Sequence, residues 1–196
     1  MPSSTLEAES RARLLRIAAD AIESGLARSA AAGPDPGALP AVLRSERASF
    51  VTLTLEGRLR GCCGSLEPRR PLVEDVWCNA QASAFRDPRF QPLEAHEWVL
   101  TDLEVAVLTP LERVEVSSEP ELLRSLRPGV DGIVVAWRGA RATFLPKVWE
   151  HLPEPRAFLG HLKQKAGWAT DFWAADVEVW RYGTEVMSEF RPAARR

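Results

Sequence analysis

The chain has 196 residues, the size of one domain or of one domain with a small lobe. Hydrophobic residues make up 45% and charged residues 27%, close to the globular average, so the chain can bury a core. The formal net charge is -2 and the pI is about 6.0. A dedicated nucleic-acid binder usually carries a basic excess that neutralises phosphates, so this composition makes nucleic acid an unexpected partner.

The composition also bears on the compartment. The N-terminus has no basic segment followed by an apolar run, and no stretch approaches the roughly 18 apolar residues that cross a bilayer. Three cysteines, of which Cys62 and Cys63 are adjacent, make a poor disulfide framework. We therefore expect a cytoplasmic protein with free thiols and no membrane partner.

The first half of the chain predicts two helices and three strands. Apolar residues at helical spacing predict a helix over 6–30 and a second helix over 71–87. Alternating apolar and polar residues predict a strand over 49–56, with a short partner strand over 58–61 after a glycine turn. A longer strand is predicted over 97–108.

The second half repeats this irregular alternation of helices and hairpins. Such an order favours an α+β class with a mixed or antiparallel sheet flanked by helices. The predicted elements are a helix over 118–126, a hairpin of 133–137 with 142–145, short helices over 146–152 and 155–166, and a strand over 177–182.

The segment 59–64 is the most informative part of the sequence. If it is extended, its side chains alternate between two faces, so Leu59, Gly61 and Cys63 share one face, and Arg60 and Cys62 share the other. Leu59 is expected in the core, which makes Cys63 a small buried apolar residue. Cys62 is then expected beside Arg60 on the other face.

This arrangement predicts a reactive cysteine. A guanidinium near a thiol favours the thiolate, so Cys62 is the candidate nucleophile and Arg60 its activating group. Gly61 and Gly64 would let the backbone approach a ligand closely, and turn amides there could bind an anion. The alternative is a tight strand end in which both cysteines are simply packed.

Other candidates follow the second helix. Asp87 and Arg89 lie two residues apart at its exit, where they would clamp a carboxylate or phosphate, or else form an ion pair that fixes the loop. Asn79 lies at the edge of the buried stripe, either reaching a pocket or marking its boundary. Lys147 and Lys165 are further cations, and Lys165 also suits a helix C-terminus.

Metal and cofactor motifs are missing from the sequence. The cysteines and histidines lack zinc-site spacing, and there is no P-loop, no dinucleotide fingerprint and no nucleophile elbow. We therefore expect this chain to bind no metal or cofactor of its own. Cys78 is expected on the outer side of the second helix.

Several short motifs in order resemble one family, the AMMECR domain family, whose bacterial and archaeal members are called AmmeMemoRadiSam system protein A. The similarity covers roughly residues 6–190. The matching motifs are Leu59-Arg60-Gly61-Cys62-x-Gly64, Arg70-Pro71-Leu72, Asn79-Ala80, Asp87-Pro88-Arg89-Phe90, Val107-Leu108-x-Pro110, Gly129-x-Asp131-Gly132, Thr143-Phe144-Leu145-Pro146-x-Val148-Trp149 and Lys165-Ala166-Gly167.

The resemblance implies a single compact domain over 1–196 with a larger and a smaller lobe and a core over 6–190. From its terminal position we expect the tail over 191–196 to be frayed. The resemblance also implies association with a Memo-type protein and with a radical SAM protein that carries its own Fe-S cluster and SAM. Whether the chain forms a homodimer is left open by the sequence. The family often has an aliphatic residue where this chain has Cys63, which agrees with a packing role, and a Gln where it has Lys147.

Two functional hypotheses follow. In the first, Cys62 and Arg60 are catalytic residues of an enzyme or enzyme-system subunit in a modification pathway, and Gly61, Gly64, Asn79, Asp87 and Arg89 bind the substrate. In the second, the groove beside Arg60 and Cys62 recognises a partner protein or an anionic ligand without chemistry. Direct RNA binding is a third and weaker hypothesis.

Overall fold

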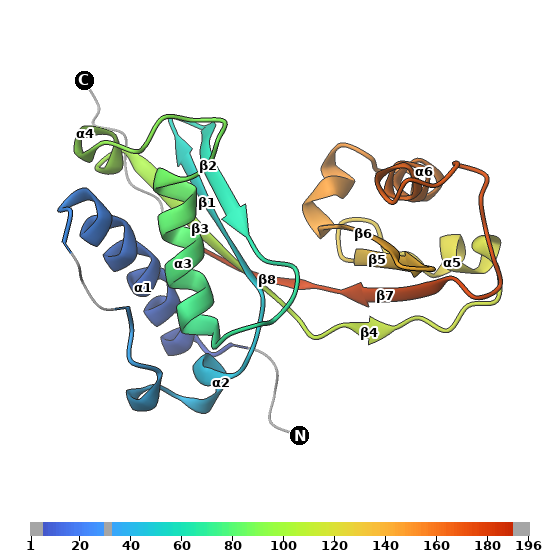
Figure 1. Cartoon of the computed structure of the whole chain (residues 1–196), viewed down its shortest axis with the longest axis horizontal. Helices are drawn as coiled ribbons and strands as arrows, with labels where there is room; N and C mark the ends of the chain where they lie inside the picture. Colours follow the sequence, from blue (N-terminus) through green and yellow to red (C-terminus); the bar gives the residue numbers. More distant parts are fainter. Residues whose placement is uncertain (1–5, 30–32, 190–196) are drawn as a thin grey trace. The chain divides into compact units, whose positions relative to one another are not determined.

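The computed structural model describes residues 6–29 and 33–189 and divides the chain into two compact units. The first unit runs through Leu108 and resumes at Glu185, and the second is the intervening segment Thr109–Thr184. Figure 1 shows the chain leaving the first unit after β3 (Thr101–Leu108) and returning to it along β8 (Thr184–Glu189). Each unit has its own sheet and its own hydrophobic core. The predicted tail 191–196 lies outside the described residues.

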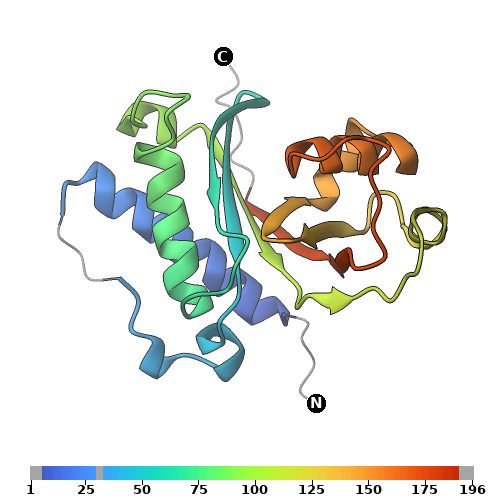
Figure 2. The same cartoon turned by 45° about the vertical axis from the view of Figure 1, so that its right-hand side comes forward.

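The first unit is a four-stranded sheet with two long helices on one face. The strand order is β2-β1-β3-β8, and β1 (Ser49–Leu55) is antiparallel to both β2 (Arg58–Gly64) and β3. Figure 2 shows α1 (Ala8–Leu26) in blue and α3 (Leu72–Phe85) in green against the same side of the sheet. The opposite side carries no helix of the first unit among the described residues, and we call it the helix-free face.

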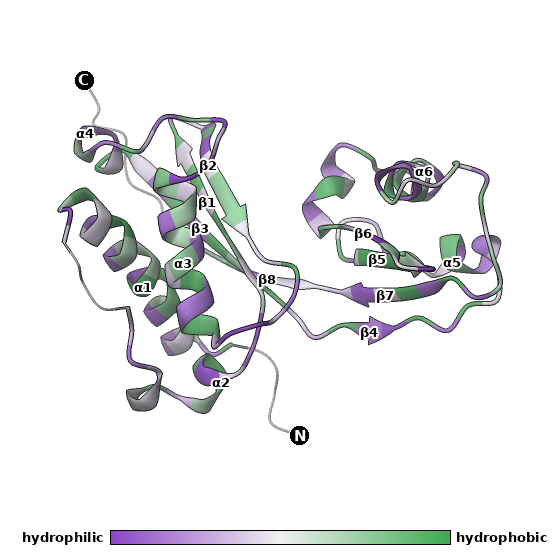
Figure 3. Cartoon of the chain, viewed as in Figure 1, coloured by the Kyte–Doolittle hydropathy of each residue, from purple (hydrophilic) through white to green (hydrophobic). Residues whose placement is uncertain are grey.

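Periodicity explains this packing. Val51 and Leu53 are two residues apart on β1, so both point toward the helices, and both are fully buried. On α1, Leu14, Ala18 and Ile22 recur every four residues and form the buried stripe. Figure 3 shows the matching hydrophobic segments on α1, α3 and the strands.

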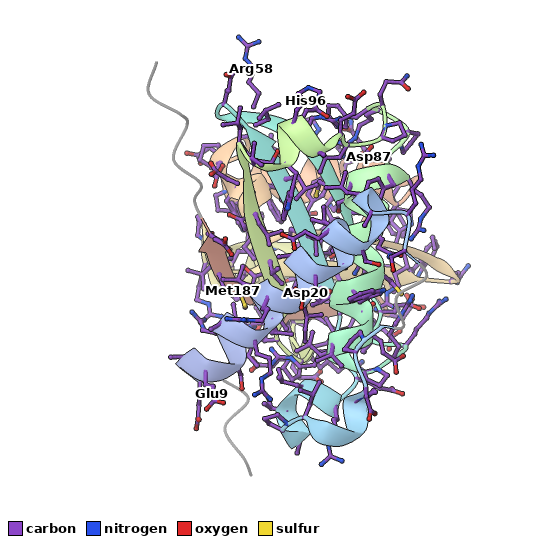
Figure 4. The ribbon with its side chains drawn as sticks, turned by 90° about the vertical axis from the view of Figure 1, so that its left-hand side faces the viewer. Glu9, Asp20, Arg58, Asp87, His96 and Met187 are labelled. Atoms are coloured by element: carbon purple, nitrogen blue, oxygen red, sulfur yellow. The ribbon has the colours of Figure 1, made fainter. Side chains whose placement is uncertain are left out.

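The hairpin between β1 and β2 is tight and contains one irregularity. Glu56 and Gly57 both have positive φ, as a two-residue turn of this kind requires, and Arg58 extends outward just beyond the turn (Figure 4). Thr54 pairs with Leu59, but Leu53 pairs with Gly61, so Arg60 is an extra residue. This is a β-bulge, and side-chain alternation along β2 changes phase there.

Several elements differ from the sequence-based expectations. The first helix is shorter than 6–30. The strand predicted over 97–108 begins at Thr101, because Glu94 and Glu97 form reciprocal caps on the short helix α4 (Ala95–Trp98). Strand β8 was missed, although its Met187 is buried in the core of the first unit (Figure 4). Two further short helices, η1 (Pro36–Ala38) and α2 (Ala41–Arg44), precede β1.

The second unit is also a four-stranded sheet packed with helices, and it confirms the α+β class. All of its strand pairs are antiparallel, in the order β4-β7-β5-β6. Its strands are β4 (Glu112–Arg113), β5 (Gly132–Trp137), β6 (Ala140–Phe144) and β7 (Glu178–Tyr182), and its helices are α5 (Glu119–Ser125), η2 (Pro146–Glu150) and α6 (Pro155–Lys165). The chain thus has two antiparallel sheets.

Aromatic stacking and one buried ion pair organise the core of the second unit. The rings of Trp149 and Phe158 stack with centroids 3.8 Å apart and planes 4° apart. Lys163 on α6 is 1% exposed, and its Nζ donates to Glu119 Oε2 at 2.7 Å and to the carbonyl of Thr170 at 3.0 Å. The pairing satisfies a charge that would otherwise be costly to bury.

Candidate functional site

Four polar side chains follow one another along one side of α3 and its C-terminal loop. Asp75, Asn79, Ser83 and Asp87 are each four residues apart, and all four are buried. Residues at this spacing lie on one face of a helix, and here that face packs on β1 and β2. We call these four residues the polar ladder.

The N-terminal end of the polar ladder fixes the start of β1. The Asp75 carboxylate accepts hydrogen bonds from Ser49 N at 2.9 Å, from Ser49 Oγ at 2.7 Å and from Ser65 Oγ at 2.8 Å. Asn79 Nδ2 donates to the Ser49 carbonyl at 3.0 Å and to Asp75 at 2.9 Å. Asn79, predicted to bind a substrate, is therefore engaged inside the first unit.

Ser83 connects the two paired strands. Its hydroxyl accepts a hydrogen bond from Cys63 N at 2.8 Å and donates one to the Val51 carbonyl at 2.7 Å. Val51 and Cys63 are register partners, so the hydroxyl bridges the β1–β2 ladder at the second cysteine. The structure thus ties the backbone of the cysteine pair directly to α3.

Asp87 and Arg89 hold the other side of the same peptide segment. Asp87 Oδ2 accepts a hydrogen bond from Cys62 N at 2.9 Å, and Arg89 Nη2 donates to the Cys62 carbonyl at 3.2 Å. Because β2 is an edge strand, these backbone groups have no neighbouring strand on that side. The two side chains bond to Cys62 as a neighbouring strand would.

The Asp87–Arg89 pair is itself tightly bonded. Arg89 donates to Asp87 through Nε at 3.0 Å, Nη2 at 2.7 Å and its own backbone N–H at 3.1 Å. The Arg89 guanidinium, followed by the N–H groups of Cys62 and Arg89, holds the pKa of the Asp87 carboxyl well below its usual range. The ion pair weighed from the sequence is therefore present, and it joins the loop after α3 to β2.

Cys62 points to the helix-free face of the first sheet. Its register partner Thr52 donates from Oγ1 to Cys62 Sγ at 3.5 Å. Thr52 also pairs with Glu104 on β3, so Cys62, Thr52 and Glu104 form one row across three strands. In the next row, the Phe50 ring lies over Gly64. Cys62 is half-buried and is not in a disulfide.

Cys63 points the other way, as the sequence predicted, although it is half-buried and not fully buried as expected. Its partner Val51 faces the helices, and burial, with the nearby charge of Asp87 second, raises the pKa of the Cys63 thiol. Cys63 is therefore held as a neutral thiol at neutral pH. The two adjacent cysteines occupy chemically different faces of one strand.

The prediction that Arg60 lies beside Cys62 is wrong. Arg60 donates to Glu97 from Nε at 2.8 Å and from Nη2 at 2.7 Å, and it lies 5.9 Å from the Phe90 ring on the helix side. The pKa of the Glu97 carboxyl is lowered, mainly by the hydrogen bonds from Arg60 and to a smaller extent by the charge of Arg60. The bulge is the cause, and it also explains why Leu59, expected in the core, is 44% exposed.

The two glycines predicted to approach a ligand approach other parts of the chain instead. A Cβ on Gly61 would lie 2.1 Å from the backbone oxygen of Ser83, so Gly61 permits α3 to pack closely on β2. A Cβ on Gly64 would lie 2.2 Å from the Phe50 ring. Each glycine thus makes room within the first unit.

The two lysines singled out from the sequence, Lys147 and Lys165, belong to the second unit. Lys165 Nζ donates to the Thr143 carbonyl at 3.0 Å and lies 5.2 Å from the centroid of the Phe144 ring. Lys147 lies in η2. Neither residue is part of the Cys62 arrangement within the first unit.

Sequence reasoning missed Thr52 and Ser83. Thr52 is recognisable only once the register of β1 against β2 is known, since any residue of β1 could lie opposite Cys62. Ser83 carried a signal, because it lies four residues after Asn79 and four before Asp87. A helix that repeats polar residues at this spacing on its buried side predicts a hydrogen-bonded ladder.

The site contains no arrangement typical of a metal centre. Over residues 6–29 and 33–189, no group of three or more His, Cys, Asp or Glu side chains is placed to hold a metal ion. In those same stretches, no helix combines the length and apolar character that a membrane crossing requires.

Comparisons with known proteins agree on one family. A family model described as AMMECR1 matches residues 15–187. A protein of Methanothermobacter thermautotrophicus is 39% identical over 178 residues, which cover 90% of this chain and 92% of the relative. A protein of Methanocaldococcus jannaschii is 34% identical, with 78% of each chain covered. The crystal structure of an uncharacterized protein from Pyrococcus horikoshii superposes with a TM-score of 0.77, at 33% identity and with 92% and 91% of the two chains covered.

Proposed function

Because the chain belongs to the AMMECR1 family, we propose that the motif segment 59–64 carries its function and that Cys62 is a nucleophile or thiol carrier. The observation that supports this proposal is the way the segment is held. Asp87, Arg89 and Ser83 bind three backbone groups of Cys62 and Cys63, and these bonds leave the Cys62 sulfur itself unengaged. A fixed backbone beneath a half-buried thiol suits a group that must be positioned for reaction.

The row across the sheet supports a nucleophilic role. Thr52 donates a hydrogen bond to Cys62 Sγ, so a donor is in place for the sulfur when it carries negative charge. In the proposed step, the thiol first loses its proton to solvent. The new S–C bond then forms as the bond between that carbon and its leaving group breaks, and the leaving group takes the electron pair.

The partners proposed for this chemistry come from the family resemblance. We propose that the chain works with a Memo-type protein and a radical SAM protein in a cytoplasmic modification pathway. The radical SAM protein would bring its own Fe-S cluster and SAM, and this chain would present Cys62. The resemblance, and not the geometry of the site, supports this pairing.

The competing proposal is a binding module without chemistry, using a groove beside Arg60 and Cys62. The two side chains lie on opposite faces of the strand, because of the bulge, so the observation that motivated this groove is lost. RNA binding gains no support either, since the net charge is -2. If the binding role holds, a Cys62→Ser variant keeps the activity of the pathway.

The nucleophile proposal is tested by the alkylation rate of Cys62. A variant whose only cysteine is Cys62 (Cys63→Ala, Cys78→Ala) is compared with one whose only cysteine is Cys78. We expect Cys62 to react with iodoacetamide at least roughly tenfold faster at neutral pH, as activated cysteines do. A Thr52→Val substitution should slow Cys62, whereas Thr54→Val, one row away on the same face, should not. Equal rates for the two cysteines would reject the proposal.

A further inference from the structure

The cation next to Cys62 is Arg89. Its Nη2 donates to the Cys62 carbonyl at 3.2 Å, whereas Arg60 is turned to the helix side and bonded to Glu97. The attraction of Asp87, first through its hydrogen bonds, raises the pKa of Arg89. The Arg89 guanidinium is therefore held against the backbone of Cys62.

Arg89 is fixed at one edge and accessible at the other. Its Nε and Nη2 are bonded to Asp87, and its guanidinium lies 5.5 Å from the centroid of the Phe90 ring. The side chain is nevertheless 54% exposed, against 3% for Asp87. Within the part of the chain that the structure describes, no hydrogen bond engages Nη1 of Arg89.

This is the geometry of an anion-binding guanidinium. Asp87 orients the fork of Arg89 and is itself buried and fully used, so it cannot contact a ligand. The free end of Arg89 presents N–H donors at the strand edge, next to the peptide of Cys62. Guanidinium donors of this kind match the oxygens of carboxylate and phosphate groups.

We propose that Arg89 is a substrate-binding residue that holds a carboxylate or phosphate of the substrate beside the Cys62 thiol. This inference rests on the proposed function of Cys62 and narrows it to substrates that carry an anionic oxygen group near the reacting carbon.

A pair of alkylating reagents tests the inference. Iodoacetate and iodoacetamide react with thiols by the same displacement, but only iodoacetate carries a carboxylate. In the protein whose only cysteine is Cys62, Arg89→Ala should lower the iodoacetate-to-iodoacetamide rate ratio about threefold, the effect of one charge a few ångströms away across water. Asp87→Asn removes the anion and keeps the cation, so it should raise the ratio.

The two substitutions should change the rate ratio in opposite directions, which distinguishes an effect of charge from an effect on the structure of the loop. If the pair only stiffens the loop, both variants shift both reagents in the same direction and leave the ratio unchanged. Arg86→Ala is the control, because it removes the same charge from an exposed arginine that bonds to the Cys78 carbonyl. The Arg89 effect should also shrink at about 0.5 M salt through screening.

The experiment distinguishes failure of the nucleophile proposal from failure of the anion-binding inference. If Cys62 reacts with iodoacetamide no faster than Cys78, the nucleophile proposal itself is rejected. If Cys62 is fast but Arg89→Ala leaves the ratio unchanged, or Asp87→Asn lowers it, the nucleophile proposal survives and the anion-binding role of Arg89 is rejected.

Discussion

At the scale of single residues, Gly61 allows α3 to pack closely on β2 because glycine has no Cβ. The helix backbone approaches this position so nearly that a methyl group would lie 2.1 Å from the Ser83 oxygen. The atom in the way is a backbone oxygen of a helix, which cannot rotate aside as a side chain would.

The prediction at Gly61 concerns stability. Gly61→Ala should lower the free energy of unfolding by about 1–3 kcal/mol, because the helix or strand must shift to remove the overlap. Urea denaturation followed by circular dichroism measures the change. Gly160→Ala on α6 is the control, since its Cβ would meet only Thr170 at 3.9 Å. That variant should be neutral or gain up to about 1 kcal/mol from helix propensity.

Residue-level patterns predicted some of the site and not the rest. Cys63 was placed correctly on the helix side, because alternation is regular between Gly61 and Gly64. Arg60 and Leu59 were placed on the wrong faces, because a bulge has no signature in apolar-polar alternation. Partners such as Thr52 depend on strand register, which a single sequence does not specify here.

At the scale of elements, α3 stabilises the cysteine segment through electrostatics as well as packing. The last member of the polar ladder, Asp87, has a pKa in the folded state far below the ordinary value of about 3.9. Its ionised form therefore stabilises the fold. This contribution is complete above roughly pH 5 and is lost as the pH falls through about 4 toward the folded pKa.

The matching prediction concerns the pH dependence of unfolding. Asp87→Asn should be less stable than the wild type at neutral pH. The difference should narrow steadily below about pH 4, where the Asp87 carboxyl of the unfolded wild type takes up a proton while that of the folded state stays ionised. Urea unfolding at several pH values between about 7 and 3 measures it. Glu74→Gln, on the same helix, removes an equal charge and serves as the control. A difference that stays constant with pH would contradict the assignment.

Elements were predicted best where periodicity was long and regular. The helices around 6–30, 71–87 and 155–166 and the hairpins at 56–57 and 138–140 follow from spacing and turn residues. The short helix α4 and strand β8 were missed, because four to six residues give too little pattern to read. Strand β8 also pairs with a strand far away in sequence, which no local signal reveals.

At the scale of the whole molecule, the second unit is a continuous segment inserted between two strands of the first sheet. Its ends are close together: Thr109 N donates to the Gly183 carbonyl at 3.0 Å, and Gly183 N donates to Thr109 Oγ1 at 2.8 Å. The chain thus leaves and re-enters the first unit at paired positions, as an inserted domain does.

This topology predicts that the first unit folds alone. Replacing residues 110–182 by a two-residue Asn-Gly turn should join Thr109 to Gly183 as a tight hairpin between β3 and β8. We expect cooperative unfolding by circular dichroism and dispersed amide signals in NMR spectra. The same deletion with Leu103→Asp, which buries a charge in the core, gives the unfolded reference. Non-cooperative unfolding of the deletion variant itself would contradict the prediction.

The bulge at Arg60 has a consequence for how such chains are compared and engineered. The face on which a residue of β2 lies is set by the number of residues in the strand as well as by their identity. Because Leu53 pairs with Gly61 and Thr54 with Leu59, deleting Arg60 would keep both pairings and make the strand regular, with Leu59 still on the helix-free face. A regular strand that kept Arg60 would instead turn Leu59 toward the helices. An alignment that ignores this one-residue insertion would assign the residues before it to the wrong side of the sheet.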